Sequence, residues 1–132
     1  MYSIQIYLIK PQLMTKLKLI LTFLFGAFML FGGINHFTKP DMYNPFIPDF
    51  LPKVVVNYLT GIAEILVGIG AFIPQTRAYA TQGILIMMLI FLPLHIMDVF
   101  KETPAIGNHQ TALIRLPVQF LFIAWAWFIN KK

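Results

Sequence analysis

The chain has 132 residues, of which 58% are hydrophobic and only 11% are charged. An ordinary soluble domain carries about 25% charged residues, so this chain has too few polar side chains to cover a water-exposed surface, and lipid is its expected solvent. The absence of cysteine excludes disulfides and thiol chemistry by this chain alone, and the net charge of +5 lies at the ends of apolar segments, so we expect no nucleic-acid partner.

The start of the chain resembles a signal peptide only superficially. Lys16 and Lys18 precede an apolar run that is long and has no A-x-A cleavage pattern, so we expect an uncleaved first span. Met14 would be a natural start of the protein. We therefore predict that residues 1–13 are a weakly ordered N-terminal extension and that residues 14–132 form one transmembrane domain.

Four apolar segments are each long enough to cross a bilayer, which takes roughly 20 helical residues. They cover residues 17–37, 54–73, 78–100 and 111–129. The break after the first segment contains four prolines, the second break is a tight turn, and the third combines proline and glycine with polar residues. The sequence predicts an all-α fold, a four-helix transmembrane bundle of two helical hairpins with a Pro-rich outer loop between helices 1 and 2. The aromatic residues of that loop, Tyr43, Phe46 and Phe50, suggest a lid over the bundle mouth.

Four spans place both chain ends on the same side of the membrane. The Lys and Arg residues on that side are Lys10, Lys16, Lys18, Arg77, Lys131 and Lys132, and those on the other side are Lys39, Lys53, Lys101 and Arg115. Because basic residues concentrate in cytoplasmic segments, the excess at the chain ends predicts that both termini are cytoplasmic.

Glu64 lies near the middle of the second span, where an ionised carboxylate facing lipid is strongly unfavourable. Its helix face also carries small and polar residues at spacings of three and four, namely Asn57, Gly61, Gly68 and Ala71. We therefore expect this face to be turned toward protein, because small residues permit close contact between helices.

The other three spans also place polar residues in their outer halves. Arg115 and Gln119 share a face of the fourth span, and we expect an ion pair between Glu64 and Arg115, assisted by Gln119. The candidate polar pocket comprises His36, Asn57, Glu64, His95, Asp98, Arg115 and Gln119. For this pair the sequence leaves open a structural role and a catalytic or ligand-binding role. The two histidines match no metal-ligand spacing, so we expect no metal.

The residues also carry a family resemblance. The run from Gly33 to Tyr43, continuing through Pro48 and Pro52, resembles the first-loop signature of DoxX-like membrane proteins. The stretches Gly61 to Glu64, Gly68 to Gly70, Ile73 to Arg77, Phe91 to Pro93 and Arg115 to Gln119 are also similar to that family. Together the similar stretches extend over nearly everything from Leu17 onward. Leu94-His95 departs from it, because many relatives have a small residue followed by Asn there.

The resemblance implies a four-helix bundle in the plasma (inner) membrane of a bacterium. His36, Glu64 and Arg115 match polar positions that recur in the family. Some relatives are linked to quinones, as subunits of a thiosulfate:quinone or quinol oxidase system. The resemblance therefore implies a membrane subunit of a quinone-linked redox complex, with quinone as the one cofactor suggested.

Three functions are compatible with these patterns. The first is the redox-complex subunit, in which His36, His95 or Arg115 donate hydrogen bonds to a quinone headgroup. The alternative is a non-catalytic membrane binding or assembly protein whose small-residue faces recruit partner helices. The third is proton-coupled transport by a homo-oligomer, with Glu64 as the carrier site. The sequence leaves open whether the protein is an enzyme.

Overall fold

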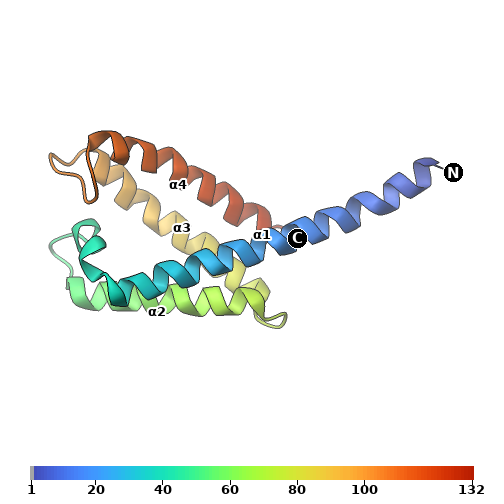
Figure 1. Ribbon diagram of the computed structural model, residues 1–132, viewed down its shortest axis with the longest axis horizontal. Helices are drawn as coiled ribbons and strands as arrows, with labels where there is room; N and C mark the ends of the chain where they lie inside the picture. The colour runs from blue at the N-terminus through green and yellow to red at the C-terminus, as the bar shows by residue number, and fades with distance from the viewer. Residues whose placement is uncertain (1) are drawn as a thin grey trace.

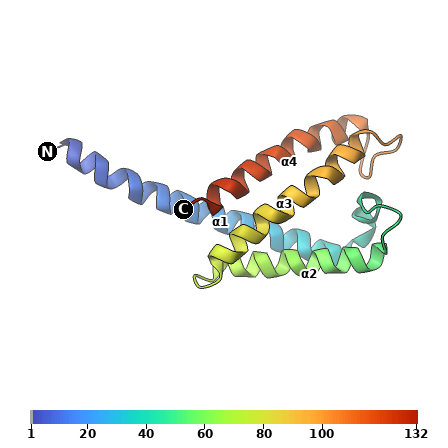
Figure 2. The same ribbon diagram turned by 180° about the vertical axis from the view of Figure 1, so that it is seen from behind.

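Four long helices form two antiparallel hairpins in the computed structural model (Figures 1 and 2). The structure describes residues 2–132, and it describes the side chains of Gln5 and of residues 13–132. The elements are α1 (Tyr2–Thr38), the short 3-10 helices η1 (Pro40–Met42) and η2 (Asn44–Phe46), α2 (Lys53–Phe72), α3 (Arg77–Val99) and α4 (His109–Asn130). This arrangement confirms the predicted all-α bundle of two hairpins and the proline-containing loop between the first two helices.

All four helices are long and apolar enough to cross a membrane, over Leu13–Thr38, Lys53–Phe72, Arg77–Val99 and His109–Asn130. Large apolar side chains cover the outside of the bundle, as a lipid environment requires. The protein is therefore a multi-pass membrane protein.

Both chain ends lie at one end of the bundle, and α1 projects beyond it toward the N-terminus (Figure 1). The predicted weakly ordered extension over residues 1–13 falls mostly on residues whose side chains lie outside the described part. It therefore stays a prediction, as does the domain boundary at residue 14.

The first hairpin, α1 with α2, is packed closely through glycines. A Cβ atom placed on Gly33 would lie 2.8 Å from the backbone oxygen of Gly61, and one on Gly68 would lie 3.0 Å from the backbone oxygen of Gly26. The face of α2 predicted to be turned toward protein is buried throughout, at Asn57, Gly61, Glu64, Gly68 and Ala71. The spacing of small and polar residues therefore predicted the buried face of this helix correctly.

The end of the bundle that holds the termini has a closed apolar core. Phe25, Ile84 and Ala126 are each 0% exposed there. The ring of Trp125 lies 4.5 Å from that of Phe25, and its indole N–H donates to the backbone oxygen of Leu21 at 3.2 Å. This core joins the two hairpins and satisfies the polar atom of its largest side chain.

Toward the opposite end of the bundle the two hairpins diverge (Figures 1 and 2). The α1–α2 loop and the α3–α4 loop both lie at this open end. The α3–α4 loop ends in a capping box, in which the Asn108 side chain accepts from the Thr111 N–H at 3.0 Å and the Thr111 hydroxyl accepts from the Asn108 N–H at 3.0 Å. Gly107, just before it, has a φ of 74°, a conformation that favours glycine. The candidate site lies between the diverging hairpins.

Candidate functional site between the two hairpins

A cavity of about 350 Å³ lies between the two hairpins at their open end. All four helices and the α1–α2 loop contribute to its wall, most of which is apolar. Phe31 is 66% exposed and Val118 is 36% exposed, and both line the cavity from within spanning helices. The cavity therefore reaches the lipid-facing surface of the bundle.

A network of hydrogen bonds at the first hairpin holds His36 in place. The Asn57 amide nitrogen donates to the backbone oxygen of Pro40 at 3.1 Å and to the side-chain oxygen of Asn44 at 3.2 Å. The oxygen of the same Asn57 side chain, Oδ1, is hydrogen-bonded to His36 Nδ1. The Tyr43 ring stacks on the His36 ring at a centroid separation of 3.7 Å. The imidazole is therefore held on one side by Asn57 of α2 and on its face by Tyr43 of the loop after α1.

Glu64 lies next to this histidine and faces the cavity. Its Oε1 atom is 3.7 Å from His36 Nε2, whereas its Oε2 atom is buried without a hydrogen-bond partner. A Cβ atom on Gly32 would lie 2.7 Å from Oε2, so the glycine leaves the space that the carboxylate occupies. Burial raises the pKa of the Tyr43 hydroxyl, and the charge of Glu64 raises it further.

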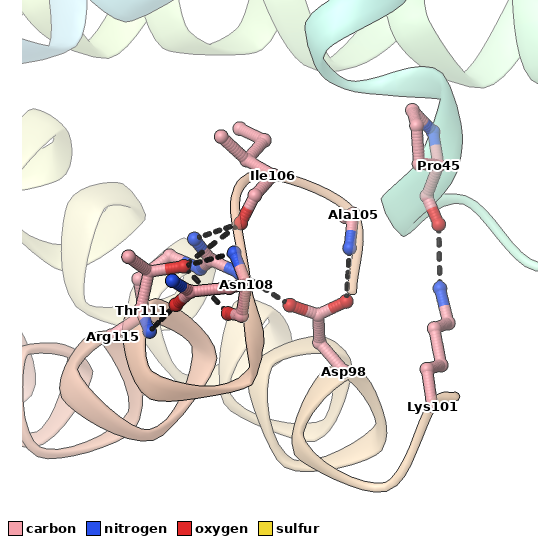
Figure 3. Close-up of polar contacts among 8 residues, drawn as sticks. All are labelled: Pro45, Asp98, Lys101, Ala105, Ile106, Asn108, Thr111 and Arg115. Carbon is pink, nitrogen blue, oxygen red and sulfur yellow. Dashed lines mark hydrogen bonds and ion pairs between the residues drawn. The ribbon is translucent and has the colours of Figure 1, made fainter. Parts of the chain in front are cut away.

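The second hairpin forms the opposite wall, and there the predicted ion pair between Glu64 and Arg115 is wrong. Arg115 Nη2 donates to Asp98 Oδ2 at 2.7 Å, and Arg115 Nη1 donates to the backbone oxygen of Ile106 at 2.7 Å (Figure 3). Asp98 also accepts from the Ala105 N–H at 2.7 Å and is 1% exposed. Arg115 pairs within its own hairpin because the α3–α4 loop folds back over it, while α2 belongs to the other, diverging hairpin.

Gln119 does not assist an ion pair either. Its amide nitrogen donates to the backbone oxygen of Met88 at 2.7 Å, so it joins α4 to α3 deep in the cavity wall. Gln119, His36 and Glu64 are buried and line the cavity, and the half-buried His95 and Arg115 line it as well. Asn57 and Asp98 are the buried partners that hold His36 and Arg115.

Phe46, from η2, contacts two polar residues of the cavity, His95 and Arg115. Its ring is 5.6 Å from the His95 ring, and the Arg115 guanidinium carbon lies 5.7 Å from its centroid. The neighbouring Pro45 accepts a hydrogen bond of 2.6 Å from Lys101 Nζ, which links the two loops (Figure 3). Tyr43 and Phe46 line the cavity, as expected of lid residues, whereas Phe50 is 85% exposed.

Three buried side-chain atoms among the described residues have no hydrogen-bond partner: Glu64 Oε2, His95 Nδ1 and Arg115 Nε. All three residues line the cavity. Buried polar atoms are normally paired, so these three are the atoms of the cavity residues that are free to bond to a ligand or to water. Over the side chains that the structure describes, no three His, Asp or Glu residues gather as a metal site requires.

Two comparisons give no match: neither a curated protein nor a solved structure is similar to this chain at a significant level. No DoxX family model matches it either. The family model that matches covers residues 25–130, which include α2, α3, α4, the part of α1 from Phe25 onward and every residue of the cavity. The chain therefore belongs to the family described as a domain of unknown function, DUF8561.

Proposed function

We propose that this membrane protein binds the ring headgroup of a quinone-type lipid in the cavity between its hairpins. The observation that carries the proposal is the set of three unpaired polar atoms, on Glu64, His95 and Arg115, in the wall of a mostly apolar cavity. Ligand sites have this character, because apolar walls supply affinity and a few polar groups fix orientation. The resemblance of the first loop and the second span to DoxX-like proteins supports the same class of ligand.

A lipid-like ligand fits the surroundings of the cavity better than a polar solute. The aromatic rings of Phe28, Phe91 and Phe122 line it and offer faces against which a flat ring can pack. Phe31 and Val118, at its lipid-facing edge, leave room for a hydrocarbon tail to continue into the bilayer. In this proposal the protein is a membrane subunit of a quinone-linked redox complex, and its partners are other subunits or further copies of itself.

The orientation is part of the proposal. The basic residues at the chain ends favour cytoplasmic termini, so the cavity end of the bundle faces the outer side of a bacterial plasma (inner) membrane. A reporter enzyme fused to the C-terminus tests this orientation. Activity of a reporter that works only outside the cytoplasm would contradict it.

An assembly role without a ligand is the second candidate from the sequence. Its main support was the small-residue faces, and the structure uses these inside the first hairpin, where Gly26, Gly33, Gly61 and Gly68 lie in the contact between α1 and α2. These glycines are therefore occupied by the contact between α1 and α2 and are not free to recruit a partner helix. We therefore place the ligand-binding role first.

The experiment is to purify the protein from native membranes in a mild detergent and to identify co-purifying lipids and proteins by mass spectrometry. We expect a quinone in the extract and a rise in melting temperature when a short-chain quinone or quinol is added. A His95→Leu variant, which keeps bulk but removes the ring nitrogens, should lose most of that rise. Absence of both the co-purifying quinone and the thermal shift would refute the proposed function.

A further inference from the structure

The unpaired atoms of the cavity differ in what they require of a ligand. Arg115 Nε carries a hydrogen at any physiological pH, so it can only donate. The other two nitrogens of the same guanidinium already donate to Asp98 and Ile106. The wall formed by the second hairpin therefore requires an acceptor atom on the ligand.

The hydrogen-bond network of the first hairpin fixes which nitrogen of His36 carries a hydrogen. Both hydrogens of the Asn57 amide are used by Pro40 and Asn44, so the atom that faces His36 must be the amide oxygen. An oxygen can only accept, so His36 Nδ1 is the donor. The second ring nitrogen, Nε2, then faces Glu64 Oε1 at 3.7 Å.

This assignment defines the role of the other oxygen of Glu64 in either protonation state. When Glu64 is ionised, both of its oxygens, Oε2 included, are acceptors. When Glu64 is protonated, Oε1 is the oxygen nearer to a proton acceptor, 3.7 Å from Nε2, and a proton on Oε1 leaves Oε2 as the carbonyl oxygen. In both of these arrangements Oε2 is a buried, unpaired acceptor in the cavity wall, so the first hairpin favours a donor on the ligand.

From these opposite requirements we infer that the cavity selects the reduced, hydroxyl-bearing form of its ligand, a quinol, over the oxidised quinone. The inference rests on the proposed function and adds its redox selectivity. A quinol hydroxyl donates to Glu64 Oε2, and the oxygen at the far side of the ring accepts from Arg115 Nε. A quinone has acceptors alone, so one of its oxygens would face an acceptor. His95 Nδ1 suits either form, because imidazole can donate or accept.

The affinity of the purified full-length protein for a decyl-chain benzoquinone and for its quinol, measured anaerobically by equilibrium dialysis, tests the inference. We expect the quinol to bind about tenfold more tightly, because the quinone leaves the buried Glu64 oxygen unpaired. The dimethyl ether of the quinol keeps the ring and tail but has no donor, and it should bind as weakly as the quinone.

A Glu64→Gln variant tests the assignment to this residue. An amide can present a donor to the cavity, so the preference for quinol should fall to parity or reverse, while the melting temperature of the protein without added ligand stays close to that of the wild type. Glu102→Gln is the matched control, since it removes the same charge from an exposed residue of the α3–α4 loop and should keep the preference.

The outcomes separate the two proposals. Equal or tighter binding of quinone than of quinol by the wild type, or tight binding of the dimethyl ether, overturns the redox selectivity but leaves a quinone-binding protein. A quinol preference that persists in Glu64→Gln overturns the assignment to Glu64. Failure of both redox forms to bind overturns the proposed function and the selectivity together.

Discussion

The two ends of the bundle are built from the same four helices but are packed differently. At the end with the termini, Phe25, Ile84 and Ala126 fill a closed apolar core. At the loop end the hairpins diverge around a cavity with unpaired polar atoms. Met29 and Met88 belong to both, because they are buried in the core and also line the cavity. The closed end can thus hold the hairpins in a fixed relation while the open end keeps a preformed site.

The largest effect on the open end should come from Arg115→Ala. This change leaves the Asp98 carboxylate buried and removes its hydrogen bond from Arg115, while the hydrogen bond from the Ala105 N–H remains. Removing one partner of a buried ion pair typically costs about 3–5 kcal/mol. Denaturant titration in detergent micelles, followed by circular dichroism, measures the loss in the free energy of unfolding.

Asp98→Asn is the matched change on the other partner. It should cost less, because the Arg115 side chain is 22% exposed and can turn its charge toward the membrane surface, whereas the Asp98 side chain is 1% exposed. Glu64→Gln should cost less still, since the carboxylate has no arginine partner. Equal losses for Arg115→Ala and Glu64→Gln would show that the pairing within the second hairpin is not what stabilises this end.

The closed end should respond most to Phe25→Ala. Phe25 is 0% exposed and packs against the rings of Phe28, Phe122 and Trp125, so its loss leaves a void that the neighbours cannot fill. Such truncations cost about 3 kcal/mol. The same titration measures the effect.

Phe91→Ala is the control at the open end. Phe91 already borders a cavity, so its truncation enlarges a space that lipid or detergent can enter and should cost clearly less than the loss of Phe25. If the two variants lose the same free energy of unfolding, the two ends do not differ in packing as the structure indicates.

The sequence was sufficient for the fold but not for the pairing in the site. Span length and the spacing of Asn57, Gly61 and Glu64 predicted the helices and the buried face of α2, because both follow from periodicity along one helix. The partner of Arg115 depends instead on how residues 101–108 fold back and on how far the hairpins diverge. Neither is encoded in a periodic pattern, so the prediction from sequence paired Arg115 with Glu64 and missed Asp98. Gly32 carried no signal, because its role is the space it leaves for a side chain on another helix.

Adjacent glycines offer a finer comparison between packing and site. Gly33→Ala would bring a Cβ atom to 2.8 Å from the Gly61 backbone oxygen, so the α1–α2 contact must open, at a cost of about 1–3 kcal/mol. Gly32→Ala instead meets the Glu64 Oε2 atom at 2.7 Å, at the end of a side chain that borders a cavity. Gly32→Ala should therefore lower the melting temperature less than Gly33→Ala does, and it should weaken quinol binding more. Melting temperature and dialysis affinity, measured on both variants, give the comparison, and the reverse order would contradict it.

The smallest effect should come from the link between the loops at the open end. Lys101→Met removes the hydrogen bond to the Pro45 backbone oxygen and keeps the length of the side chain. Because this contact is exposed, its loss should change the free energy of unfolding by less than about 1 kcal/mol, yet it should loosen the α1–α2 loop that carries Phe46.

The chain has no cysteine, so cysteines introduced at Asp49 and Glu102, both exposed, accept spin labels without further changes. We expect a narrow distance distribution between the labels in the parent protein and a broader one with Lys101→Met. Lys39→Met, which changes an exposed lysine of the α1–α2 loop, should leave the distribution narrow. Unchanged distributions in both variants would mean that Phe46 and the apolar contacts of η2 hold the loop in place without Lys101.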